Sequence, residues 1–183
     1  MSPLLLVHDA GAQPLFRRAA KHVRPCEVLL DVGAGIRPQR MIECKQHVCI
    51  EPHGEYADVL QESGFTVVRA TGVQALDRWK GQVDTIVAID VLEHMAREEG
   101  ERFVLLAKAK ARQQVVLFTP LGFFPQDGGG KVDPWGLQGQ HWQTHRSGWL
   151  PREFPGWTCL VDKKFNSGAG AFFAIWDAER LAA

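Results

Sequence analysis

The chain has 183 residues, with 21 basic and 21 acidic side chains and a formal net charge of zero. This length accommodates one domain with its own hydrophobic core but not two of ordinary size, so we expect a single domain over residues 1–183. The balanced charge gives no overall bias toward nucleic acid or an anionic membrane.

The cysteines and the first residues bear on the cellular compartment. The four cysteines form no CxxC pair and no zinc-like cluster with histidine, which favours reduced thiols. The apolar run over residues 4–7 is shorter than the core of a signal peptide and far too short to span a membrane. We therefore expect a cytoplasmic protein.

An apolar run over residues 28–32 is followed at once by two glycines. The run suits a strand buried on both faces of a sheet. Gly33 and Gly35 allow a sharp turn and a close approach of the backbone to a ligand. Pro38 favours the first turn of a new helix, expected over residues 39–45. This pattern is typical of a site that binds a nucleotide-like ligand, although a glycine turn can also simply connect a strand to the next element. The missing third glycine disfavours a dinucleotide as the ligand.

Strands and helices alternate along most of the remaining chain. A leading amphipathic helix is expected within residues 1–25. Further strands are expected over residues 47–52, 65–69, 83–89 and 115–119, and helices over 55–63 and around 103–110. This alternation predicts a mostly parallel α/β sheet. Two final β-rich runs, joined by residues 166–168, predict a closing antiparallel hairpin.

Polar residues follow several of these strands. Glu51, at the tip of the second strand, is placed to accept two hydrogen bonds from a ribose diol, or else is a surface carboxylate. Gly72 lines an adenine pocket or is a glycine of a connecting loop with no role in binding. The fourth strand leads into Asp90-Val91-Leu92-Glu93-His94.

Residues 121–150 show no periodic pattern but contain three tryptophans and two histidines. Long segments of this kind are usually functional or disordered. The aromatic content favours an ordered lid over the acceptor site.

Together these motifs resemble the class I S-adenosylmethionine-dependent methyltransferases over residues 27–176. DVGAG matches the first motif of that family, IEP the second and DTIVAIDVLEHM the fourth, and the fifth strand ends in TP. The resemblance implies a three-layer Rossmann-like sandwich with a seven-stranded sheet, S-adenosyl-L-methionine as cofactor, and methyl transfer as the reaction. The cofactor-binding residues that it implies are Asp31, Gly33, Ala34, Gly35, Glu51, Pro52, Gly72, Val73, Asp90 and Val91.

Two positions depart from the family pattern. Arg37 stands where the first motif usually has a third small residue, and ATGVQ lacks the acid often found near the adenine amine. We expect the backbone of Gly72 and Val73 to serve in its place. The GIRPQ and HRSGW segments resemble small methyltransferases among glycan-modifying enzymes, which favours methylation of an oxygen in a small-molecule or glycan-like acceptor.

His94 and His145 are the candidate catalytic residues, because a hydroxyl acceptor must lose its proton and imidazole titrates near neutral pH. Either histidine could instead have a structural role. Arg146 is a candidate for binding an anionic acceptor, or is a solvated surface residue.

Three alternatives remain open. Asp90, Glu93 and His94 resemble the metal-binding residues of methyltransferases that act on quinone precursors and small-RNA ends, although no metal is expected in the leading hypothesis. A catalytically silent cofactor-binding subunit and an NAD-linked oxidoreductase are the others. The sequence does not indicate an oligomeric state.

Overall fold

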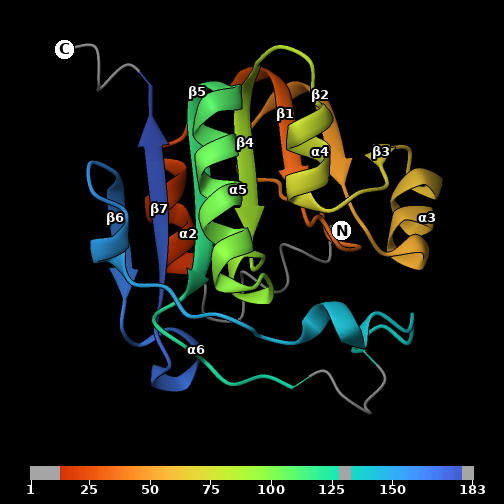
Figure 1. The fold of residues 1–183 in the computed structure, drawn as a ribbon. Coiled ribbons are helices and arrows are strands. Elements are labelled where there is room, and N and C mark those ends of the chain that lie inside the picture. The colour runs from red at the N-terminus through yellow and green to blue at the C-terminus, as the bar shows by residue number, and fades with distance from the viewer. Residues whose placement is uncertain (1–12, 128–132, 179–183) are drawn as a thin grey trace.

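The computed structural model describes residues 13–127 and 133–178. Seven strands form one sheet in the order β3-β2-β1-β4-β5-β7-β6 (Figure 1). The strands are β1 Cys26–Val32, β2 Cys44–Ile50, β3 Thr66–Val68, β4 Val83–Ile89, β5 Ala111–Pro120, β6 Thr158–Asp162 and β7 Ala171–Asp177. Strands β1 to β5 are parallel to one another, and β7 runs antiparallel to both β5 and β6. The predicted sheet and its closing hairpin are confirmed.

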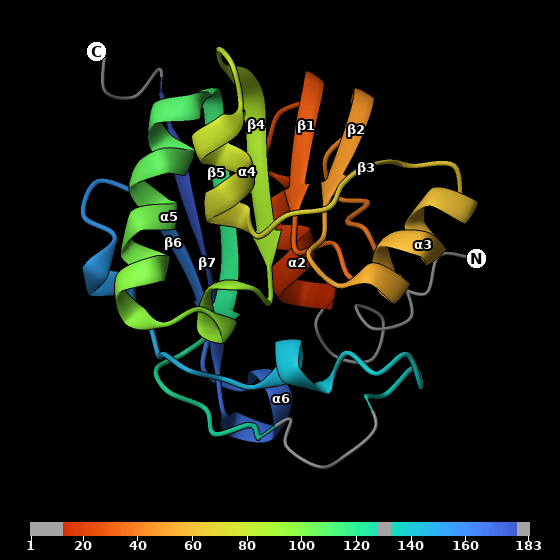
Figure 2. The same ribbon diagram turned by 45° about the vertical axis from the view of Figure 1, so that its right-hand side comes forward.

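Helices lie on both faces of this sheet. The α-helices are α2 Gln13–Ala20, α3 Gly54–Glu62, α4 Gly72–Arg78, α5 Arg97–Lys110 and α6 Phe165–Gly168, and the 3-10 helices are η2 Leu92–His94, η3 Gln140–Gln143 and η4 Pro151–Glu153. Figures 1 and 2 show α4 and α5 on one face and α2 on the other. Among the described residues, no helix has the length and apolarity needed to cross a bilayer.

Successive residues of β1 enter two different hydrophobic cores. Leu30 packs with Leu76 of α4 and Phe103 of α5, whereas Leu29 packs on the opposite face with Phe16 of α2. The four side chains other than Phe16 are fully buried. A strand covered on both faces consists mostly of consecutive apolar residues, which is why the sequence pattern predicted β1.

The prediction of a helix over residues 39–45 is wrong. Residues 39–43 are irregular chain with a bend at residues 41–42, and β2 already begins at Cys44. The Asp31 carboxylate accepts a hydrogen bond from the backbone N–H of Gln39 at 2.8 Å. The Gln39 side-chain oxygen in turn accepts from the N–H groups of Met41 and Ile42, at 2.8 and 2.9 Å. Because side chains satisfy these donors, the segment after Pro38 closes as a compact turn instead of a helix.

The other expected elements are confirmed with small shifts in their ends. The leading helix is described only from residue 13, and the part of the 1–25 prediction before it lies outside the described residues. The residues after β4 form the separate short helix η2, which ends at His94, before α5 begins at Arg97. The β6–β7 connection contains Asn166 and Ser167 at positive φ, 49° and 57°, as a tight connection between antiparallel strands requires.

Candidate functional site

Two adjoining cavities lie at the carboxyl ends of the parallel strands. The larger, of about 440 Å³, extends from the β1 tip past β4 and β5 to the start of β7. The smaller, of about 100 Å³, lies between the tips of β1 and β2, the start of α4 and the segment after β4. Gly33, Gly35, Asp90, His94 and Gln143 line both cavities. Ligands of open α/β sheets bind at this edge.

Most residues implied by the methyltransferase resemblance meet at these cavities. Besides Gly33, Gly35 and Asp90, which line both, Asp31 and Ala34 line the larger cavity, and Glu51, Pro52, Gly72 and Val91 line the smaller one. Val73 lines neither, because its side chain packs in the core beneath α4.

The glycine turn brings the β1 tip against the segment that follows β4. Gly33 and Gly35 have φ values of 65° and 56°, in the left-handed region that favours glycine. A Cβ atom added at Gly33 would lie 2.6 Å from Cγ2 of Val91. Only glycine therefore permits both this backbone conformation and this contact.

The Glu51 carboxylate connects the β2 tip to the glycine turn. One carboxylate oxygen accepts from the backbone N–H of Gly35 at 2.8 Å, and the other accepts from the N–H of His53 at 2.9 Å. Glu51 is 3% exposed, and this burial raises the pKa of its carboxyl while the two N–H bonds act in the opposite direction. Sequence spacing placed Glu51 at the cavity but did not reveal the bond to Gly35.

Thr71 and Gly72 begin helix α4. The Thr71 hydroxyl accepts from the N–H of Gln74 at 3.3 Å, and the Gln74 side chain accepts from the N–H of Thr71, which completes a capping box. A Cβ atom at Gly72 would lie 2.7 Å from Cγ1 of Val32. Gly72 is therefore the first residue of a helix and not of a connecting loop, and a residue with a side chain would not fit there because the helix start packs directly on β1.

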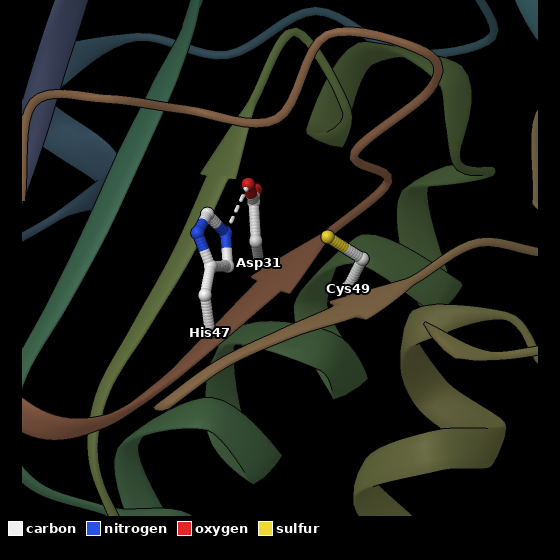
Figure 3. Close-up of side chains that lie close together, drawn as sticks. All are labelled: Asp31, His47 and Cys49. Carbon is white, nitrogen blue, oxygen red and sulfur yellow. Dashed lines mark hydrogen bonds and ion pairs between the residues drawn. The ribbon is translucent and has the colours of Figure 1, made fainter. Parts of the chain in front are cut away.

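Asp31 is held by its neighbours on the sheet. Its carboxylate lies 2.9 Å from Nε2 of His47 on β2, with Cys49 two residues further along the same strand (Figure 3). One potential ligand atom from each of these three residues lies within 4.8 Å of the others. Burial raises the pKa of the Cys49 thiol, which packs among Ala34 and Leu60. A protonated thiol in an apolar cluster is a poor metal ligand, so we assign Asp31 and His47 an orienting contact.

Asp90 and Glu93 form a pair of neighbouring carboxyl groups. Asp90 faces both cavities with an unusual positive φ of 53°, and desolvation of its carboxyl group raises its pKa. Glu93 is 2% exposed, and burial and the charge of Asp90 raise its pKa well above the usual range. One Glu93 oxygen accepts from the Thr119 hydroxyl at 2.9 Å, while the buried Oε1 has no hydrogen-bond partner among the described residues.

His94 and His145, the predicted catalytic pair, lie side by side with ring centroids 4.7 Å apart. Nδ1 of His94 lies 3.1 Å from the carbonyl oxygen of Thr144, and Nδ1 of His145 lies 2.6 Å from that of Phe124. A carbonyl accepts only, so we assign the proton of each ring to Nδ1, which leaves both Nε2 atoms with a lone pair. Burial lowers the pKa of His94 to about 4 and also lowers that of His145, so both rings are neutral at pH 7.

Hydrogen bonds from the two residues after His145 attach this part of the chain to helix η2. The N–H groups of Arg146 and Ser147 donate to the carbonyl oxygen of Glu93, at 2.7 and 3.1 Å. The Arg146 guanidinium donates to the carbonyl oxygens of His94 and His141, at 2.9 and 3.2 Å. Arg146, proposed from sequence as an anion-binding residue, thus attaches the 121–150 segment to η2.

The described part of that segment also contacts α3. His53 lies 2.6 Å from the carbonyl oxygen of Leu137 through its Nε2, and the rings of Tyr56 and Trp135 meet edge-on at 5.4 Å between centroids. The Asp133 carboxylate accepts from three backbone N–H groups, those of residues 135, 137 and 139. Trp135, one of the three tryptophans that favoured a lid, lines the larger cavity, and so do Gln126 and Gln143, which the sequence pattern did not single out.

No protein-family model matches the sequence, and no curated protein matches it significantly. Solved structures do match its fold. One is a SAM-dependent methyltransferase from Archaeoglobus fulgidus, with a TM-score of 0.62 at 14% identity, covering 94% of this chain and 93% of that one. Another is magnesium protoporphyrin IX methyltransferase from Synechocystis PCC 6803 with bound SAM, with a TM-score of 0.55 at 10% identity, covering 96% and 83%.

A third similar structure is the small RNA methyltransferase HEN1, with a TM-score of 0.54 at 13% identity, covering 91% of this chain and 25% of that one. At these identities the likeness establishes the fold. The predicted Rossmann-like methyltransferase fold is therefore confirmed.

The low pKa of His94 makes the stability of the protein depend on pH in a predictable direction. The unfolded chain binds a proton at this histidine near pH 6.5, whereas the folded chain does so only near pH 4. The contribution of His94 is therefore fully present above about pH 6.5 and is lost as the pH falls toward 4. Between pH 7.5 and 5, the wild type should lose up to about 2 kcal/mol more than His94→Gln in urea unfolding. The exposed His22 supplies a control, His22→Gln, which should follow the wild type; equal losses in all three proteins would refute a buried, neutral His94.

Proposed function

We propose that this chain binds S-adenosyl-L-methionine across the tips of β1, β2 and β4 and transfers its methyl group to an oxygen of a small-molecule or glycan-like acceptor in the larger cavity. The Glu51 carboxylate is the observation that carries the proposal. Its two oxygens offer about four acceptor positions, and backbone N–H groups occupy two of them. The remaining lone pairs are available to the two donors of a ribose diol.

The two cavities suit the two parts of such a cofactor. The smaller cavity, beside Glu51, Pro52 and Gly72, would take the adenosine part, and Asp31, Gly33 and Gly35 border the larger cavity where the methionine part would lie. The similar Synechocystis methyltransferase was crystallised with bound SAM, which supports the same cofactor here.

Positioning would supply most of the rate acceleration. Methyl transfer is an in-line displacement, so holding an acceptor oxygen opposite the sulfonium replaces a bimolecular encounter with an intramolecular one. The C–S bond breaks as the C–O bond forms, S-adenosylhomocysteine leaves, and the hydroxyl proton passes to a base. His94 and His145 present unprotonated Nε2 atoms near the cavity and are the proposed proton acceptors.

The open larger cavity favours catalysis over a silent cofactor-binding subunit. Its volume of about 440 Å³ leaves room for an acceptor beside His94 and His145. Phe124 lies at its wall, and Phe123 is 59% exposed, so neither ring fills the space. The antiparallel β7 between β5 and β6 gives no support to an NAD-linked oxidoreductase, because the usual dinucleotide-binding sheet is built from parallel strands of two βαβαβ halves.

The role of Glu51 can be tested by calorimetry. Glu51→Ala should weaken the binding of S-adenosylhomocysteine at least about tenfold, because the ribose would lose charge-assisted hydrogen bonds and the glycine turn would lose its anchor. Glu62→Ala, on the exposed end of α3, should bind like the wild type. Equal affinity of Glu51→Ala and the wild type would contradict the assignment.

A divalent cation is a second candidate participant, favoured by a specific observation. Glu93, His94 and His145 each offer one ligand atom within 4.8 Å of the others. The Glu93 Oε1 atom, buried and without a described partner, is an acceptor that a cation would satisfy. Both imidazoles are neutral and bonded through Nδ1 to carbonyls, which is how histidine ligands of metals are usually oriented.

These residues therefore fit a cation, which Asp90 could also contact from the neighbouring position. A cation held there would lower the pKa of an acceptor hydroxyl, and the two histidines would then be ligands and not proton acceptors. The similarity to the small RNA methyltransferase HEN1 makes an RNA-end hydroxyl the acceptor to test in this version of the proposal.

Manganese binding separates the two versions without an activity assay. In calorimetry with Mn²⁺, the wild type should bind one ion, and Glu93→Gln should weaken that binding at least about tenfold by removing a charged ligand. Glu98→Gln, which alters an exposed acid of α5, should leave it unchanged. Wild-type binding no tighter than that of Glu93→Gln would leave the histidines as proton acceptors and exclude the metal version.

A further inference from the structure

Two buried side-chain N–H groups at the wall of the larger cavity have no acceptor among the described residues. Nε of Arg37 and Nε1 of Trp135 are both inaccessible to solvent, and neither has a hydrogen-bond partner within residues 13–127 and 133–178. Both residues line the larger cavity, and the Arg37 guanidinium carbon lies 5.4 Å from the centroid of the Trp135 ring. Two unsatisfied donors thus lie next to each other at one wall.

Leaving such groups unpaired is unfavourable. A buried donor without a partner has lost its hydrogen bonds to water and gained none in return, and this loss is larger if the group is charged. Arg37 also forms no ion pair with a carboxylate in the part of the chain that is described, in contrast to Arg97 and Arg112. Because both side chains line the cavity, a small rotation that turns these N–H groups toward it would let a bound ligand supply the missing acceptor.

The chemistry of the donors indicates which ligand group fits. A guanidinium presents several N–H groups in one plane, which matches the oxygens of a carboxylate or phosphate, and an indole N–H adds one neutral donor. Arg37 is the only lysine or arginine among the described residues that line this cavity. Since the guanidinium of Arg146 is already bonded to backbone carbonyls, an anionic group here would have Arg37 as its cationic partner.

We propose that Arg37 and Trp135 form an anion-binding subsite of the larger cavity, which takes a carboxylate or phosphate group. The subsite rests on the proposed function, because the anion would belong either to the methionine end of the cofactor or to the acceptor. It also gives a physical reason for the departure from the usual small residue at position 37.

Binding measurements distinguish the two sources of the anion. If the cofactor supplies it, Arg37→Gln weakens S-adenosylhomocysteine binding at least about tenfold in calorimetry. The same variant binds 5′-methylthioadenosine, which lacks the amino-acid carboxylate, as the wild type does. Arg40→Gln, in the same turn but exposed and stacked over Phe65, is the matched control and binds both compounds normally.

If the acceptor supplies the anion, inorganic phosphate or acetate reports it. In protein saturated with S-adenosylhomocysteine, either anion should shift the indole N–H resonance of Trp135, assigned from the spectrum of Trp135→Phe, and Arg37→Gln should abolish that shift. The subsite is overturned if Arg37→Gln binds S-adenosylhomocysteine normally and neither anion moves the resonance. If the wild type binds no S-adenosylhomocysteine, the proposed function fails, and the phosphate titration of the free protein still decides whether the subsite exists.

Discussion

A single buried carboxylate connects the two strand tips on which the rest of the site depends. Glu51, the first residue after β2, accepts hydrogen bonds from the N–H groups of Gly35 and His53. The first bond fixes the glycine turn after β1, and the second fixes the chain that enters α3. Because β1 and β2 are parallel neighbours in the sheet, one side chain can hold both exits at the same edge. The smaller cavity exists between them.

A second set of contacts assembles the chemistry on the other side of that turn. The short helix η2 leaves its last carbonyl groups without helical partners, and the 121–150 segment supplies donors to them. The backbone N–H groups of Arg146 and Ser147 donate to the carbonyl oxygen of Glu93, and the Arg146 guanidinium donates to that of His94. These bonds bring His145 beside His94 and close the cavity around the two acids. His94 and His145 therefore lie side by side because the 121–150 segment donates hydrogen bonds to backbone carbonyl oxygens of η2, which is distant in the sequence.

The sequence was sufficient to predict the mostly parallel sheet with its closing hairpin and the edge at which the cavities lie, but not the contacts between distant segments. Strands buried on both faces are continuous apolar runs, and glycine turns mark their ends, so β1, β4 and the cavity at their tips were predictable. The helix expected over residues 39–45 was wrong because the acceptor that redirects this segment, Asp31, comes from the preceding strand. Likewise, no spacing rule relates Glu51 to Gly35, His145 to His94, or Trp135 to Arg37.

The central claim is that an adenosyl sulfonium compound lies across the tips of β1, β2 and β4. A crystal structure of the protein soaked with S-adenosylhomocysteine tests it most directly. The account predicts ribose hydroxyls within hydrogen-bonding distance of the Glu51 carboxylate, with the sulfur in the larger cavity beside Asp90. Density for the compound at another place, or none at concentrations that saturate the protein in solution, would contradict it.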